Sequence, residues 1–219
     1  MASFQKKSLD SAFANAGDTM SMISPGNTKM GALPSFSIST ASCDLIPGPD
    51  EQGCKKHCYA KRHIEIYPSA KKSYARNYVA TQTDLFSAEM DLEIKTNKTV
   101  QKAGIIRWHV AGDFYDQNYL NRVFEICKLN PNILFYGYTK AYNLDWTLRP
   151  ANLIMRLSDD KGIWGAHYGK FDAVATVYDP NQPCPKGFIP CGSQRVPGMT
   201  CAQCRLCAGR KGNVGFKRH

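Results

Sequence analysis

A series of short, almost continuously apolar runs most constrains the fold of this 219-residue chain. Such runs are typical of parallel strands whose sheet is covered on both faces. A further segment, "SFSIST", alternates apolar and hydroxyl side chains, which is the period of a half-buried strand. The pattern predicts about six strands, at residues 35–40, 104–114, 132–140, 152–158, 171–179 and 213–219.

Helical periodicity appears between some of these strands. Phe86, Met90 and Ile94 recur on one helical face. Helices are therefore expected at residues 68–82, 84–96 and 116–129. Strands that alternate with helices predict an α/β fold, and six strands are fewer than the eight of a closed barrel. We expect an open or partial (βα) barrel of about six mainly parallel strands with a Cys-rich, irregular C-terminal segment.

The chain divides by composition into three segments of a single domain. Residues 1–34 are rich in Ser, Gly, Asn and Met, and they predict an irregular arm. Residues 35–182 form the α/β core, and residues 183–219 form a Cys-rich metal-binding tail packed on it. No apolar run approaches the roughly 20 residues that cross a bilayer, and the start of the chain has no secretory pattern. We expect no membrane contact and a reducing cytoplasm, where structural disulfides are rare.

Five of the nine cysteines lie in the tail, in a stretch of Pro and Gly. Three of them form CxxCxxC, a spacing that lets successive thiolates converge on one inorganic centre. Thiolate sites of this kind hold zinc or iron–sulfur clusters, and three cysteines in sequence are more typical of a 4Fe–4S cube. The candidate ligands here are Cys201, Cys204 and Cys207, with Cys184 and Cys191 as further candidates.

A second cysteine group follows the first predicted strand. Ten residues separate Cys43 from Cys54, and three separate Cys54 from Cys58. Lysines and an arginine surround the last two, which favours thiolates and balances the charge of a cluster. We interpret the three as ligands of a 4Fe–4S cluster with one iron left open, so that the chain holds one or two clusters. Cys127, on an apolar helix face, is predicted to be a core residue.

Charged side chains are expected near the first cysteine group. If Trp108 faces one side of its strand, Arg107 and His109 face the other, and Asp113 follows at the carboxyl end. The three are candidate catalytic residues, with His109 as a general acid–base or a fourth ligand. An open iron beside His109 would suit a hydrolase or lyase acting on a small molecule, and reductive cleavage of a cofactor is the other enzymatic option. Lys140, Tyr138 and Arg156 are interpreted as a solvated rim.

A formal charge of +10, from 28 basic and 18 acidic residues, permits a nucleic-acid partner. The alternative function is thus a non-catalytic zinc-binding module that contacts nucleic acid. The sequence contains no P-loop, no HExxH and no GxSxG motif, so it gives no support for a nucleotide triphosphatase or a serine hydrolase.

The stretches "GNTKMGALPSFSIST", "CKKHCYA", "IIRWHVAGDF" and "CAQCRLC" together resemble the phage gene product 88 family. The resemblance implies a phage origin, iron–sulfur binding and a location in the host-cell cytoplasm. A more distant likeness links the chain to radical S-adenosylmethionine enzymes, which share a partial barrel, a three-cysteine loop after the first strand and a glycine-rich acidic turn similar to "AGDF". This likeness implies S-adenosylmethionine as a cofactor, although the usual CxxxCxxC spacing is absent.

Overall fold

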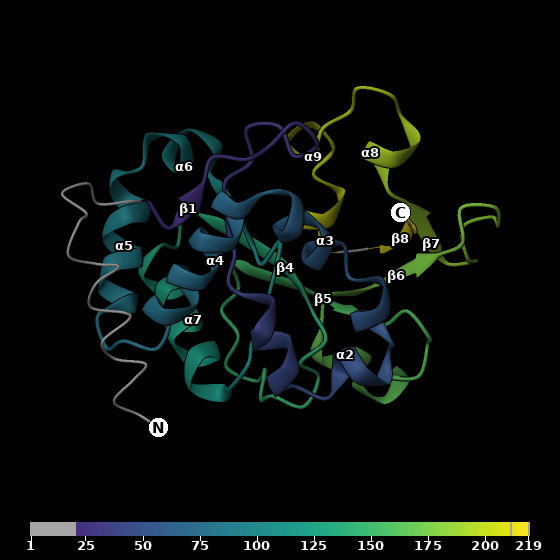
Figure 1. Ribbon diagram of the computed structural model, residues 1–219, viewed down its shortest axis with the longest axis horizontal. Coiled ribbons are helices and arrows are strands. Elements are labelled where there is room, and N and C mark those ends of the chain that lie inside the picture. Colours follow the sequence, from purple (N-terminus) through teal and green to yellow (C-terminus); the bar gives the residue numbers. More distant parts are fainter. Residues whose placement is uncertain (1–20, 211, 219) are drawn as a thin grey trace.

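A computed structural model describes residues 21–210 and 212–218. Its centre is an open, eight-stranded sheet in the order β1-β2-β3-β4-β5-β6-β8-β7 (Figure 1). All neighbouring pairs are parallel except β1 with β2. The strands are β1 Ile23–Ser24, β2 Ser35–Phe36, β3 Ile105–Trp108, β4 Leu134–Thr139, β5 Leu153–Ser158, β6 Ala173–Tyr178, β7 Phe188–Pro190 and β8 Asn213–Lys217.

Helices fill the connections between strands. The α-helices are α2 Gly48–Glu51, α3 Tyr59–Ile66, α4 Pro68–Ala80, α5 Phe86–Thr96, α6 Lys98–Ala103, α7 Gln117–Leu129, α8 Gly192–Arg195 and α9 Cys201–Cys204. Short 3₁₀ turns are η1 Thr40–Leu45, η2 Cys54–His57, η3 Gly165–Lys170 and η4 Leu206–Ala208. None of the helices in the described part of the chain is long and apolar enough to cross a membrane.

The mainly parallel α/β class and all six predicted strands are confirmed, and α4, α5 and α7 correspond to the three predicted helices. The predicted strand count was wrong, because β1 and β7 have only two and three residues and leave no periodic signal. Two predicted strands were also too long, since β2 ends at Phe36 and β3 at Trp108. The sheet does not close, and its curvature into a partial barrel stays a prediction.

The two faces of the sheet have different covers. One face packs against α5 and α7 in the main apolar core, where Phe36, Trp108 and Phe135 are fully buried. Burying one such aromatic side chain contributes about 1.5–3 kcal/mol. The other face carries a smaller cluster in which Ile105 and Tyr136 meet residues of the arm and of the tail. A Cys-rich segment therefore covers the part of the sheet that a helix covers in an ordinary α/β protein.

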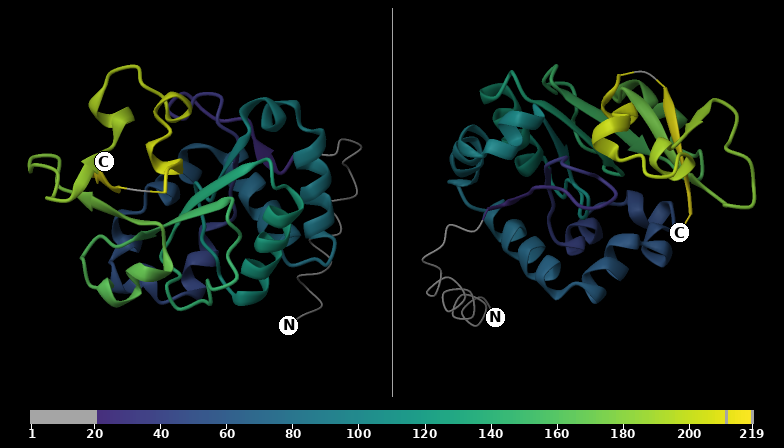
Figure 2. Two further views of the ribbon diagram at one scale, coloured as in Figure 1. Left: turned by 180° about the vertical axis from the view of Figure 1, so that it is seen from behind. Right: turned by 90° about the horizontal axis from the view of Figure 1, so that it is seen from above.

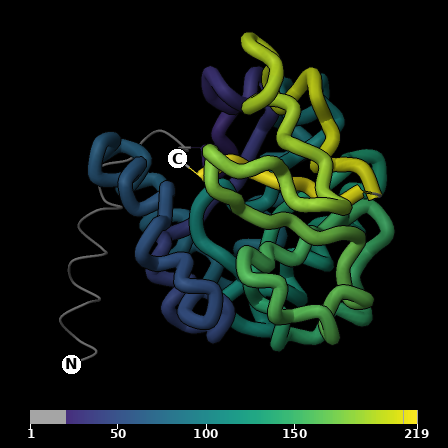
Figure 3. Tube along the Cα trace, turned by 90° about the vertical axis from the view of Figure 1, so that its right-hand side faces the viewer, coloured from purple at the N-terminus to yellow at the C-terminus, as the bar shows by residue number. Residues whose placement is uncertain are grey.

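The described part of the arm lies beside the tail. Figure 3 shows the purple segment that precedes β2 next to the yellow end of the chain. The backbone amides of Cys201 and Ala202 donate to the carbonyls of Lys29 and Met30, at 3.2 and 3.0 Å. In Figures 1 and 2, α8, β7 and β8 of the tail lie at the end of the sheet away from α5 and α6. Residues 1–20 of the predicted arm lie outside the described residues.

Candidate functional site

Three thiols meet at the carboxyl end of the first parallel strand, and we refer to Cys43, Cys54 and Cys58 as the first-loop thiols. Cys43 lies in η1, Cys54 opens η2, and Cys58 immediately precedes α3. The thiols of Cys54 and Cys58 are hydrogen bonded, and Cys43 interacts electrostatically with Cys58. All three are free and partly exposed. The predicted first group thus assembles, although ten residues separate its first two members.

The electrostatics of the first-loop thiols favour one shared negative charge. The hydrogen bond from Cys54, together with the amides of Lys61 and Ala60 at the start of α3, lowers the pKa of Cys58 to about 6 against the opposing effect of burial. The same bond to Cys58, followed by burial, raises the pKa of Cys54. Burial, with the nearby carboxylate of Asp113, raises the pKa of Cys43 to about 12. The Cys54–Cys58 pair therefore holds a thiolate near neutral pH.

Asp113 ties the first loop to the strand ends. Its carboxylate accepts hydrogen bonds from the Thr139 hydroxyl at 2.6 Å and from the backbone amide of Lys140 at 2.8 Å. Its own amide donates to the hydroxyl of Ser42, the neighbour of Cys43. Burial raises the pKa of Asp113 to about 6, against the opposing effect of these bonds. The side chain is buried within hydrogen bonds, so its geometry indicates positioning of the loop.

Lys140 forms a second anchor beside Cys54. Its Nζ donates to the carbonyl and the hydroxyl of Ser158, both at 2.9 Å, and pairs with Asp160 at 3.0 Å. A Cβ on Gly48 would lie 2.0 Å from the carbonyl oxygen of Lys140, so the first loop approaches β4 at a distance that only glycine permits. Lys140 is buried, which corrects its interpretation as part of a solvated rim.

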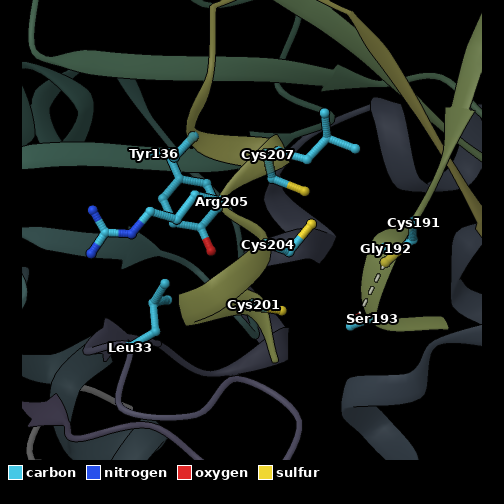
Figure 4. A pocket seen from close by; sticks show the side chains of 11 residues that line it. Leu33, Tyr136, Cys191, Gly192, Ser193, Cys201, Cys204, Arg205 and Cys207 are labelled. Atoms are coloured by element: carbon cyan, nitrogen blue, oxygen red, sulfur yellow. Dashed lines mark hydrogen bonds between the residues drawn. The ribbon is translucent and has the colours of Figure 1, made fainter. Parts of the chain in front are cut away.

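Four further cysteines line one small pocket, and we refer to Cys191, Cys201, Cys204 and Cys207 as the tail thiols (Figure 4). α9 carries the first two members of CxxCxxC, and a capping box between Thr200 and Gln203 holds its start. Arg205, at φ 48°, turns the chain so that Cys207 comes back to the pocket.

Close backbone approach brings α8 to α9. A Cβ on Gly192 would lie 2.6 Å from Sγ of Cys204. Cys184 does not line the pocket; its thiol lies 3.5 Å from the carbonyl oxygen of Phe188, beside β8. Tyr178 interacts electrostatically with both Cys184 and Cys191, so this thiol is a neighbour of the tail group. Cys127 is fully buried in α7, as predicted.

Arg156 binds the tail to the sheet and is fully buried, which also corrects its place in a solvated rim. Its guanidinium donates to four backbone carbonyls of the segment that follows α9. These acceptors are Cys207 at 2.9 Å, Gly212 at 2.6 Å, Leu206 at 3.1 Å and Gly209 at 2.7 Å. A single side chain of β5 therefore fixes the loop that carries the last tail thiol. No pattern in the sequence indicated this role, because a strand arginine is usually exposed.

Arg107, His109 and Asp113 do not come together in one site, although the sequence predicted one site for these three candidate catalytic residues. β3 ends at Trp108, and His109 has φ 58°, so the alternation of side chains stops there. The imidazole is buried in the main core, 4.5 Å from the ring of Phe114, with Nε2 at 2.8 Å from the hydroxyl of Tyr119.

Burial lowers the pKa of His109 to about 3, so the ring is neutral near pH 7. Arg107 faces the opposite side of the sheet, where its guanidinium carbon lies 5.2 Å from the centre of the Tyr138 ring. The placement of His109 gives it no contact with the first-loop thiols in the structure.

Among the described residues, no group of three or more His, Cys, Asp and Glu side chains is arranged to hold a metal ion. The first-loop and tail thiols are thus two groups of neighbouring sulfurs without the close convergence of a preformed single-ion site.

The family of phage proteins described as "Gene product 88" matches residues 19–210. The chain belongs to this family. The "Gene 88 protein" of Mycobacterium phage L5 is 25% identical over 218 residues, which cover 87% of this chain and 89% of that protein. No solved structure matches the chain. The resemblance to the phage family is therefore confirmed, and it extends over most of the α/β core and the tail.

Proposed function

We propose that this phage protein binds two 4Fe–4S clusters in the host-cell cytoplasm, one at the first-loop thiols and one at the tail thiols. The observation that supports the proposal most is the grouping of seven of the nine cysteines into these two sets. Cysteines used only as small core residues would be dispersed and buried, as Cys127 is.

The donor sets fit such clusters in type and in number. Four thiolates are the usual complement of a cluster, and the tail pocket offers four with no imidazole or carboxylate among its lining residues. A single zinc ion, at about 2.3 Å from each sulfur, needs its thiolates within about 3.8 Å of one another. In a 4Fe–4S cube each thiolate binds a different iron, so the four sulfurs can lie farther apart. The described sulfurs are not arranged closely enough for a single ion, which agrees with a cube.

Positive charge near both sets supports anionic centres. Lys61 and Lys140 interact with Cys58 and Cys54, and Arg156 interacts with Cys207. Thiolate-ligated clusters carry net negative charge, so each cation beside them stabilises the loaded state.

The first-loop thiols number three, so a cluster bound there would have one iron without a cysteine ligand. Such a cluster supplies either a Lewis acid or an electron donor to a small-molecule substrate. Asp113 and Lys140 hold the loop against β4, and thereby fix where a substrate would lie. His109 is not part of this proposal, because the main core encloses it. S-adenosylmethionine is also a proposed cofactor. The order of a cysteine loop after β2 and the Gly112–Asp113 turn after β3 is similar to that of enzymes that use it.

The test is metal analysis of protein purified without oxygen. We expect a brown protein with broad absorbance near ~400 nm and roughly eight irons and eight sulfides per chain. Cys58→Ala and Cys204→Ala should each lose about half of the iron, and the double variant should lose nearly all of it. Cys127→Ala is the matched control and should keep its iron. A wild-type protein without iron, or a double variant that keeps its full complement, refutes the proposal.

Zinc at the tail thiols is the second candidate, because four cysteines on short, irregular elements are also typical of structural zinc sites. In that case the protein is a zinc-stabilised module, and its charge of +10 suggests a nucleic-acid partner. A colourless preparation with about one zinc per chain would favour this candidate. Retention on duplex DNA that falls with rising salt would support the partner.

A further inference from the structure

Arg107 is a cation without a counter-ion on the tail-facing side of β3. Its guanidinium stacks on Tyr138, and its Nε is buried without a hydrogen-bond partner among the described residues. The side chain as a whole is partly exposed. Arg122 and Arg149, by contrast, pair with Asp84 and Asp172.

The surroundings of Arg107 supply no carboxylate in the described part of the chain. The groups that interact with its charge are the hydroxyls of Tyr59, Tyr74, Tyr136 and Tyr138 and the thiol of Cys207. Tyrosine hydroxyls are neutral at pH 7. An unpaired guanidinium with a buried, unpartnered Nε is costly, and proteins keep such groups chiefly where a ligand supplies the missing charge.

Arg107 also lies between the two cysteine groups. Tyr59 interacts with Arg107 and with both Cys58 and Cys54, and its hydroxyl donates to the carbonyl of Val110. On the other side, the Tyr138 hydroxyl is hydrogen bonded to Cys207. A ligand held by Arg107 would therefore lie within reach of the first-loop thiols and the tail thiols.

We propose that Arg107 binds the carboxylate of a small-molecule ligand, in the space between the first-loop and tail thiols. The ring of Tyr138 covers one face of the guanidinium, so its edge is the part left for a planar, bidentate partner. The buried cations near the two cysteine groups are engaged: Lys140 pairs with Asp160, and Arg156 donates to four carbonyls. A single free guanidinium matches the one charge of a carboxylate better than the nearly two charges of a phosphate. Only the position of the ligand beside a cluster rests on the proposed function.

Thermal unfolding of the anaerobically purified full chain tests the inference. Acetate replaces chloride up to about 100 mM at constant ionic strength, and inorganic phosphate is the second probe. For a dissociation constant near 10 mM, acetate should raise Tm by about 3 °C. Arg107→Met should abolish this shift. Arg107→Lys keeps the positive charge but loses the paired N–H donors of the guanidinium, so it should retain less than half of the shift. Arg195→Met, which removes an exposed arginine of the tail outside the pocket, should leave the shift unchanged.

Three results overturn the inference. The first is an acetate shift that is absent from wild type or equal in wild type and Arg107→Met. The second is a larger, Arg107-dependent shift with phosphate, which would make the ligand a phosphate. The third is a loss of iron in Arg107→Met and Arg107→Lys without an acetate effect, which would make Arg107 a counter-charge for the tail cluster. Iron content of the same samples separates the two proposals, because an iron-free wild type refutes the clusters and leaves the acetate result standing.

Discussion

Replacing Arg156 should release the tail from the sheet. Arg156→Met keeps an apolar side chain and removes every donor that Arg156 supplies to its four carbonyls. Of these carbonyls, that of Leu206 keeps the amide of Gly209, and that of Gly209 belongs to an exposed residue. An unsatisfied buried acceptor costs about 1 kcal/mol or more. The carbonyls of Cys207 and Gly212, at about 1.5 kcal/mol each, lower the free energy of unfolding of the tail by about 3 kcal/mol, which is a large fraction of the stability of a typical domain. Lysine has three donors on one atom, so Arg156→Lys should lose less, about 2 kcal/mol.

The assay separates the tail from the core. The three tryptophans belong to the described core, at positions 108, 146 and 164, so their fluorescence during urea unfolding reports the core. Trypsin cleavage after Arg210, an exposed tail residue, reports local opening of the tail. We expect Arg156→Met to be cleaved at least 100-fold faster than wild type at urea concentrations where tryptophan fluorescence is still native.

Arg195→Met is the matched control, because Arg195 is an arginine of the tail whose side chain is exposed. Its tail should open no more than about 3-fold faster than wild type. If Arg156→Met is cleaved at the wild-type rate, the four hydrogen bonds do not hold the tail and the reasoning is wrong.

Three further predictions concern the loops and the core. Gly48→Ala should destabilise the protein by about 2 kcal/mol and lower iron at the first-loop thiols, because the new Cβ meets the backbone of Lys140; unchanged stability in urea would contradict it. Gly192→Ala should cost less than about 1 kcal/mol, since its Cβ meets the movable thiol of Cys204, yet it should reduce tail iron, and full iron content would count against it. The folded pKa of His109, about 3, lies below its unfolded value of 6.5, so its stabilising effect is complete above pH 6.5 and is lost as the pH falls towards 3. Between pH 7 and 5, wild type should therefore lose about 2 kcal/mol more than His109→Gln in chemical denaturation, and parallel pH profiles would refute this.

The sequence could predict those features that depend on local pattern. Apolar runs, with the alternation of "SFSIST", identified six of the eight strands, and cysteine spacing identified both thiol groups. It could not place His109, because one residue of positive φ after Trp108 transfers the side chain to the other face of the sheet. It also could not foresee Arg156, since the cover over that part of β5 comes from residues about 50 positions away in the chain.

The tail has too little regular structure to fold by its own secondary structure. α8 and α9 have four residues each, and helices so short gain almost nothing in isolation. What holds the tail in the structure is the pairing of β8 with β6, the four hydrogen bonds of Arg156, the ion pair of Arg210 with Asp172, the backbone pairing with Lys29 and Met30, and a small apolar cluster around Tyr136. A cluster bound by the tail thiols would add its binding free energy to this docking, because metal binding to an unformed site is also folding free energy. The metal and Arg156 therefore both favour the docked tail over the open tail. Arg156→Met should thus increase tail opening less in the metal-loaded protein than in the metal-free protein.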